Sequence, residues 1–167
     1  MALSTEDVAA IWLTLQLAGS TTLVLLILGT PLAWWLSNTA SRWRIPVGAI
    51  VALPLVLPPT VLGFYLLITF GPLGPIGRVT EALGLGTLPF TFAGLLLGSV
   101  IYSLPFAVQP FQAALRAVPR ELLDAGTALG ATPTRVFLRV HAPLAWRGIA
   151  AGLTLGFAHT LGEFGVV

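Results

Sequence analysis

Residues 119–143 read PRELLDAGTALGATPTRVFLRVHAP and form the longest stretch with charged and polar residues in an otherwise apolar chain. Pro119 suits a first helical position, and Glu121 and Asp124 lie in the opening turns, where the helix dipole favours anions. Gly130 suits a left-handed cap that ends this helix. The stretch therefore begins with one short helix, whose apolar stripe is formed by Leu122, Ala125 and Leu129.

A second short helix is predicted directly afterwards. Thr132 and Pro133 suit an N-cap followed by a first helical position. Val136, Phe137 and Val140 give this helix an apolar side, and Pro143 precedes a new apolar run. The pattern indicates two short amphipathic helices outside a membrane, between two spans. A plain connector resting on the lipid surface would have the same composition, because basic amphipathic helices often lie on anionic headgroups.

The composition of the whole chain indicates an integral membrane protein. Hydrophobic residues make up 56% of the 167 residues and charged residues only 8%, which is too few for a water-soluble surface. The net charge of +2 comes entirely from arginine, because lysine is absent. The arginines are scattered near predicted span ends, so no basic face for nucleic acid is expected. Without cysteine, the chain has no disulfide, thiolate nucleophile or cysteine-based metal site.

The apolar runs predict a single all-α domain over residues 1–167, built as a polytopic helical bundle. Each predicted span is long enough to cross about 30 Å of hydrocarbon at about 1.5 Å per residue. The segment 71–89, rich in glycine and proline, is expected to be a loop with at most one interfacial helical turn. The predicted spans are 11–36, 45–70, 90–115 and 144–162.

Prolines interrupt the second predicted span near its middle. Pro54, Pro58 and Pro59 each remove a backbone donor and clash with the preceding turn, so the helix must kink or break there. Exposed backbone at this depth is tolerated where it is buried in protein or faces a water-filled cavity. The kink therefore either improves packing or, together with Thr60, lines a transport pathway.

Polar and small residues recur on single faces of the last two spans. Ser99, Tyr102 and Ser103 lie near helical spacing and either hold helices together or line a cavity. In the fourth span, glycines at 148, 152 and 156 form a small-residue face. Such a face predicts close helix packing, either within the subunit or to another one.

The distribution of arginine predicts the orientation of the chain in the membrane. With alternating spans, seven arginines fall on one side and only Arg78 on the other. The arginine-rich side is expected to be cytoplasmic. This puts the N-terminus outside and the 119–143 segment inside. The seven are Arg42, Arg44, Arg116, Arg120, Arg135, Arg139 and Arg147.

Neither a metal site nor an enzymatic site is predicted. His159 and Glu163 share one helical face, but a metal needs three or four ligands, and His141 lies at the opposite membrane face. A carboxylate would repel an anionic cargo, so Glu163 is expected to have a structural or gating role. A chain without lysine has no Gly-Lys-Ser/Thr phosphate loop, so an ATP-driven process would need an ATPase on another polypeptide.

Three segments of the chain resemble permeases of ABC importers. The family's EAA loop has the pattern E-A-A-x3-G-x9-I-x-L-P. This chain resembles it with Asp124-Ala125-Gly126, three residues, Gly130, nine residues and then Val140-x-Ala142-Pro143. Asp, Gly, Val and Ala stand here in place of Glu, the second Ala, Ile and Leu. LPLVLPPTVLG (53–63) and LGEFG (161–165) are similar to strings of molybdate-type permeases.

The resemblance implies a permease subunit of an importer for molybdate, or next for tungstate, working by ATP-driven alternating access. Sulfate, thiosulfate and phosphate permeases share the loop. The implied partners are a second copy of the chain, two cytoplasmic ATPase subunits that hold ATP and Mg²⁺, an outer oxyanion-binding protein and the bilayer. The residues implied in coupling are Glu121, Asp124, Ala125, Gly126, Gly130, Ala131, Thr132, Pro133, Val140 and Pro143.

Two other classes of membrane protein remain as alternatives. A channel or secondary transporter would show an inverted repeat or a charged relay inside the spans, and neither is seen. A non-catalytic scaffold requires no positive feature. The sequence stops directly after LGEFG, where the family continues into an outer loop and at least one further span, so the last family span is expected to be missing.

Overall fold

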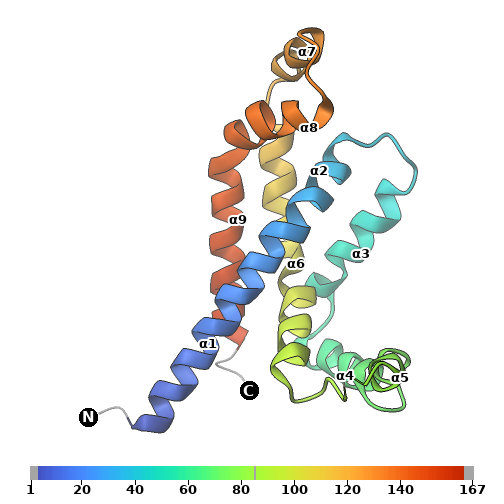
Figure 1. Cartoon of the computed structure of the whole chain (residues 1–167), viewed down its shortest axis with the longest axis vertical. Coiled ribbons are helices and arrows are strands. Elements are labelled where there is room, and N and C mark those ends of the chain that lie inside the picture. The colour runs from blue at the N-terminus through green and yellow to red at the C-terminus, as the bar shows by residue number, and fades with distance from the viewer. Residues whose placement is uncertain (1–3, 85, 164–167) are drawn as a thin grey trace.

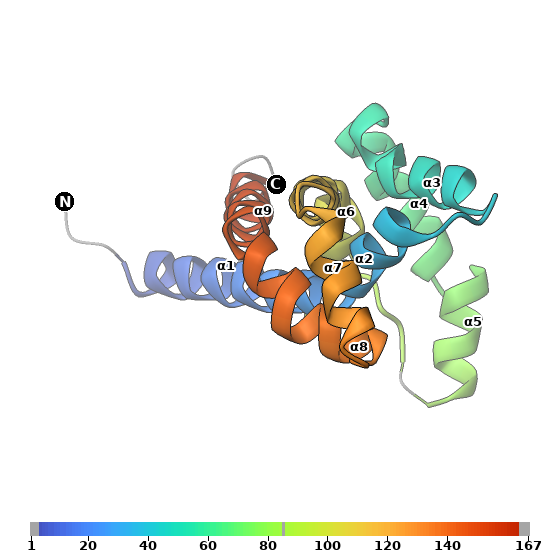
Figure 2. The ribbon, with the colours of Figure 1, turned by 90° about the horizontal axis from the view of Figure 1, so that it is seen from above.

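The computed structural model describes residues 4–84 and 86–163, and within these ranges every regular element is a helix. α6 and α9 run along the long axis of the molecule, and α1, α2 and α3 cross it obliquely (Figures 1 and 2). The short helices α7 and α8 lie at one end of this bundle, and α4 and α5 lie at the other (Figures 1 and 2).

The first helical rod is longer than the predicted span 11–36. It consists of α1 (Thr5–Val24), a π-helical segment (Leu25–Gly29) and α2 (Thr30–Asn38), with no interruption between them. Ser4 starts it with a capping box, in which the Asp7 amide donates to Ser4 Oγ over 3.1 Å and the Ser4 amide donates to Asp7 Oδ2 over 2.9 Å. At about 1.5 Å per residue the 34-residue rod is about 51 Å long, which exceeds the hydrocarbon core.

Both π-helical segments end two residues before a proline. The first precedes Pro31, and the second, Phe137–His141, precedes Pro143. A proline ring clashes with the carbonyl four residues earlier and cannot bond to it. Those carbonyls belong to Ile27 and Arg139, each at the centre of its π-helical segment. The wider π turn thus lets the helix continue through each proline instead of ending.

The predicted span 45–70 is divided into two helices. α3 (Arg44–Val56) and α4 (Pro59–Phe70) are separated by Leu57 and Pro58, whose ψ angles of 133° and 140° are extended. A residue that precedes proline is pushed out of the helical region, and both Leu57 and Pro58 precede one. With 13 residues α3 is only about 20 Å long, so 45–70 does not form one straight helix.

The segment 71–89 contains more structure than the loop predicted for it. α5 (Pro75–Ala82) follows Gly74 as N-cap and has proline at its first position. Gly77 packs directly on the carbonyl of Gly71, where a Cβ atom would collide. This contact brings α5 back against the end of α4, and it leaves Ile76 and Val79 on an exposed apolar side.

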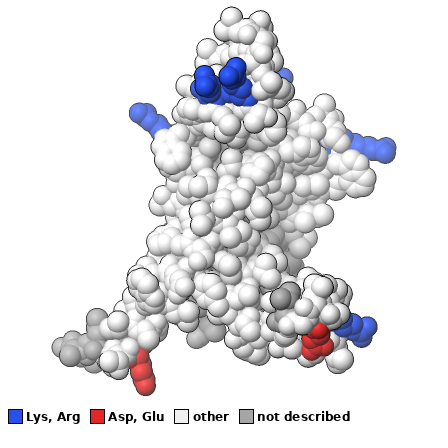
Figure 3. All heavy atoms as spheres, in the orientation of Figure 1, with Lys and Arg blue, Asp and Glu red and all other residues white. Residues whose placement is uncertain are grey.

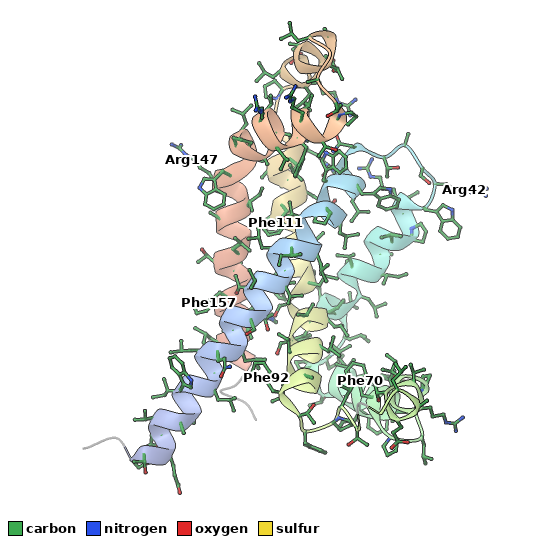
Figure 4. The ribbon with its side chains drawn as sticks, in the orientation of Figure 1. Arg42, Phe70, Phe92, Phe111, Arg147 and Phe157 are labelled. Atoms are coloured by element: carbon green, nitrogen blue, oxygen red, sulfur yellow. The ribbon has the colours of Figure 1, made fainter. Side chains whose placement is uncertain are left out.

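The core is formed where α9 (Ala142–Glu163) packs on α6 (Phe92–Arg116). A Cβ added at Gly152 would lie 2.8 Å from two ring atoms of the fully buried Phe111, and one added at Gly148 would overlap Ala114. Phe111 lies inside the bundle, and Arg42 and Arg147 lie on opposite flanks (Figure 4). The small-residue face of the fourth span is therefore used within the subunit, against α6.

By length and composition, three stretches could cross a membrane: Thr5–Asn38, Pro59–Ala82 and Phe92–Arg116. The second of them consists of α4 and α5 with a turn at 71–74 between them. α9, with 22 residues, is also long enough to cross about 30 Å. Pro105 and Pro110 lie inside α6 without ending it. The fold is an all-helical, multi-pass membrane bundle.

Candidate functional site

The helical hairpin made by α7 (Arg120–Ala128) and α8 (Pro133–Val136) projects from one end of the bundle (Figure 1). None of the residues of α7 is buried. Leu129, at its C-cap, is 89% exposed, and Leu122 and Leu138 are exposed nearby. The hairpin thus presents exposed apolar side chains at the end of the bundle.

The turn between α7 and α8 has a defined hydrogen-bond pattern. The Gly130 amide donates to the Thr127 carbonyl over 2.9 Å, and the Ala131 amide donates to the Gly126 carbonyl over 3.2 Å. These two bonds form a Schellman motif, with Gly130 at φ +79° in the left-handed position. The predicted left-handed cap at Gly130 is confirmed.

The second helix starts where the sequence predicts it but does not stay short. Thr132 is the N-cap, its Oγ1 accepts from the Arg135 amide over 3.4 Å, and Pro133 occupies the first position. The helix then continues through the π-helical segment Phe137–His141 into α9. The prediction of a separate second helix is therefore wrong: α8 and the last span are one continuous helix, which bends between α8 and α9 (Figure 1).

Gly126 departs from the family's alanine, and the structure gives a physical reason for it. A Cβ at this position would lie 3.2 Å from Cγ2 of Val136, which is buried. The absent side chain lets α7 pack closely on α8. Glycine weakens a helix by about 1 kcal/mol relative to alanine, and this close contact offsets part of that cost.

The base of the hairpin is tied to two other helices. His141 is buried, and its Nε2 lies 2.8 Å from the Leu115 carbonyl near the end of α6. The ring of Phe137 packs on Trp34 of α2, with 5.3 Å between ring centroids. The sequence analysis missed this anchoring role of His141. The available signal was a histidine within an apolar helical stretch, since such a residue needs a polar partner when buried.

The residues predicted for coupling lie on α7, on the turn after it, on the start of α8 and near the junction with α9. Glu121, Asp124, Ala125, Gly130, Thr132, Pro133 and Pro143 are exposed, and Gly126, Ala131 and Val140 are half-buried.

The residues predicted to line a pathway lie on different elements. Pro58, Pro59 and Thr60 are exposed at the break between α3 and α4, where the Pro58 carbonyl accepts from the Val61 amide over 3.0 Å. Ser99 is buried on α6.

A polar cluster connects α6 with α9. Ser103 Oγ lies 3.1 Å from His159 Nδ1 and 3.0 Å from Thr160 Oγ1, and Ser103 and Thr160 are fully buried. The His159 ring stacks on the Phe106 ring with 3.8 Å between centroids. Its centroid lies 4.8 Å from that of the half-buried Tyr102 ring. Such contacts hold helices together. Glu163 is the last residue of α9, and its side chain lies outside the described residues.

Charge is distributed unevenly between the two ends of the bundle. On the face shown in Figure 3, arginines gather at the end that carries α7 and α8, and carboxylates lie at the opposite end, where one arginine is also seen. On this face, uncharged residues cover the surface between the two ends (Figure 3). A multi-pass helical bundle with its charged residues gathered at the two ends defines the class of integral membrane proteins.

Comparisons with known proteins agree with this class. The family model described as binding-protein-dependent transport system inner membrane component matches residues 12–167. The chain is 60% identical over 167 residues to the molybdenum transport system permease protein ModB of Azotobacter vinelandii, covering 100% of this chain and 74% of that protein. It is 38% identical over 156 residues to the ModB protein of Mycobacterium tuberculosis, covering 93% and 59%.

A solved structure supports the fold independently of sequence. A bacterial ABC transporter that imports the acidic polysaccharide alginate superposes with a TM-score of 0.78 at 20% identity, covering 95% of this chain and 58% of that chain. The chain belongs to the family of inner-membrane components of binding-protein-dependent transport systems. It is a multi-pass permease subunit of the ABC type, a class that works with ATPase and binding-protein partners.

Proposed function

We propose that the chain is the permease subunit of a molybdate importer. The observation that carries this proposal is the 60% identity, along the whole chain, to the A. vinelandii molybdenum permease. The helical hairpin supports this proposal, because the exposed helix α7 offers a surface that an ATPase could bind. Tungstate is the next candidate cargo, since it is the oxyanion closest to molybdate in shape and charge.

The hairpin provides a mechanical route from an ATPase to the transmembrane helices. α8, the π-helical segment and α9 are one continuous helix with a bend, so a displacement of α8 acts on the start of α9. The bond between His141 and the Leu115 carbonyl passes the same displacement to α6. The close contact between Gly126 and Val136 holds α7 against α8. Movement of α7 by the ATPase would thereby reorient the two helices that form the core, as alternating access requires.

The proposed assembly has two copies of the chain, a cytoplasmic ATPase pair that binds ATP and Mg²⁺, and an oxyanion-binding protein outside. The hairpin faces the cytoplasm and the N-terminus faces outward, because the arginine-rich end is expected inside. The helix break at Pro58, Pro59 and Thr60 is a candidate part of the pathway. Ser99, Tyr102 and Ser103 of α6 and Glu163 of α9 are further candidates.

Sulfate is the second candidate cargo. The chain is 34% identical over 160 residues to a probable sulfate transport system permease protein, cysT, of Chlorella vulgaris, covering 96% of this chain and 60% of that protein. This identity is well below that to the molybdenum permease. The binding protein selects much of the cargo, so the permease contributes only part of the specificity.

The test is ATP hydrolysis by the protein reconstituted in proteoliposomes with its ATPase. Binding protein loaded with molybdate, tungstate or sulfate is added in turn. Stimulation by molybdate or tungstate alone, lost when Gly130 and Asp124 are replaced, is the expected result. Stimulation by sulfate alone would keep the importer class and change the cargo. Failure of any ATPase to associate would overturn the proposal.

A further inference from the structure

At the end of the bundle that carries the hairpin, two adjoining grooves share Arg44 and Arg116 in their walls. One, of about 480 Å³, lies along the turn between α2 and α3, and Arg42 also lines it. The other, of about 290 Å³, lies under the hairpin, and Arg120 and His141 line it. Together they form what we call the arginine groove. Its lining contains four arginines and no aspartate or glutamate.

The arginines keep their charge available to a ligand. Within the described residues, no ion pair with a carboxylate is formed by Arg44, Arg116 or Arg120. Arg116 is held at the groove by its Nη2, which donates to Gln112 Oε1 over 2.9 Å and lies 3.4 Å from the Leu36 carbonyl. A guanidinium carries five N–H donors, so others remain for an anion. Planar guanidinium groups suit tetrahedral oxyanions such as phosphate.

The position of the groove matches the level of lipid headgroups. α2 ends at Asn38, α3 begins at Arg44 and α6 ends at Arg116, so three helices end around it. Trp43 at the turn is 62% exposed, and tryptophan favours the membrane–water interface.

The lining also has an apolar part, which includes Leu36, Gly48 and Ile45, the last of them 79% exposed. A lipid satisfies both parts, with its phosphate on the arginines and its acyl chains on the apolar wall. A free oxyanion satisfies only the first.

We propose that the arginine groove is a binding site for the phosphate of an anionic phospholipid headgroup. Basic pockets between transmembrane helices bind such headgroups. The proposal depends on no assumption about the transported cargo. A bound headgroup would join the α2–α3 turn to the end of α6 and the start of α7, next to the base of the hairpin.

Native mass spectrometry of the purified protein in neutral detergent tests this proposal. Phosphatidylglycerol and phosphatidylcholine are added in equal amounts, and the bound lipid is counted. We expect a clear preference for phosphatidylglycerol, reduced about fivefold by Arg44→Gln and by Arg116→Gln, since a basic residue near an anionic lipid contributes about that factor. Arg44→Gln removes no hydrogen bond to the protein, so it tests the site even if Arg116→Gln destabilises the fold.

Arg147→Gln is the matched control, because Arg147 lies on α9, outside the lining of both grooves. It removes the same charge and should leave the preference unchanged. An equal loss in all three variants, or no preference in the wild type, would overturn the proposal. A parallel arm measures thermal unfolding without lipid, in phosphate or chloride at equal ionic strength. Stabilisation by phosphate in the wild type but not in Arg44→Gln would keep the oxyanion site and identify free phosphate as its ligand.

Discussion

His141 Nε2 lies 2.8 Å from the carbonyl oxygen of Leu115, and both residues are buried. The carbonyl belongs to the last turn of α6, where no amide of the same helix is left to bond to it. The histidine satisfies this acceptor and joins the base of the hairpin to the end of α6. One side chain thus links the projecting element to the two helices of the core.

Replacing His141 by phenylalanine should separate the hairpin from α6. The Leu115 carbonyl would be buried without a donor, which costs about 1–3 kcal/mol. We expect a lower midpoint of thermal unfolding in detergent and reduced coupling of ATP hydrolysis to loaded binding protein. His141→Gln is the matched variant, since its amide can donate to the same carbonyl. If the phenylalanine variant were as stable as the wild type, the hydrogen bond between His141 and Leu115 would not contribute to the stability of the fold.

Replacing Gly130 by alanine should weaken the turn between α7 and α8. Gly130 has φ +79°, and a Cβ in this conformation costs about 1–2 kcal/mol. We expect weaker stimulation of the partner ATPase, with most of it retained in Gly130→Asn, because asparagine tolerates the left-handed region. Gly86→Ala is the control, because Gly86 has a similar φ of +74° in the segment before α6. Loss of stimulation in Gly86→Ala as large as in Gly130→Ala would contradict a specific role for the hairpin turn.

Replacing Gly126 separates helix propensity from packing. Alanine would raise the propensity of α7 by about 1 kcal/mol, while its Cβ, at 3.2 Å from Val136 Cγ2, would require only a small shift. We expect Gly126→Ala to be close to neutral and Gly126→Leu to lose ATPase stimulation. Val136→Ala should restore part of the activity of Gly126→Leu. If Gly126→Leu were fully active, the close contact between α7 and α8 would not matter for coupling.

The hairpin was largely predictable because local rules act within a few residues. Gly130, Thr132 and Pro133 each define a cap or a start from their own chemistry, and all three do so in the structure. Where the second helix ends was not predictable in this way. Pro143 indicates a helix boundary, but the π-helical segment before it lets the helix continue into α9 with a bend (Figure 1). Only the packing of the whole helix decides between these outcomes.

The interactions between distant residues were not predictable either. Ser103 shows only as a polar residue in an apolar span, and its bonds to His159 and Thr160 depend on how α6 and α9 face each other. The glycine face of α9 left two options open, contact within the subunit or with another one. The position of Phe111 against Gly152 decides for the first.

Replacing Gly152 by alanine should disrupt the core. The added Cβ would lie 2.8 Å from two ring atoms of Phe111 and 3.1 Å from the Ala107 carbonyl, and such overpacking costs about 1–3 kcal/mol. We expect a lower unfolding midpoint, partly restored by Phe111→Leu. Gly19→Ala is the control, because a Cβ there meets nothing within 4 Å. Equal effects of the two alanines would contradict the packing of α9 on α6.

The orientation of the chain can be measured directly, because the protein has no cysteine of its own. A single cysteine at Leu129, which is 89% exposed on the hairpin, should react with a membrane-impermeant maleimide only in inside-out vesicles. A single cysteine at Leu83, exposed after α5 at the other end, should react only in right-side-out vesicles. The physical reason is the arginine excess at the hairpin end, which favours retention on the cytoplasmic side. The opposite labelling pattern would put the hairpin out of reach of a cytoplasmic ATPase, and the coupling role proposed for α7 would be wrong whatever the cargo.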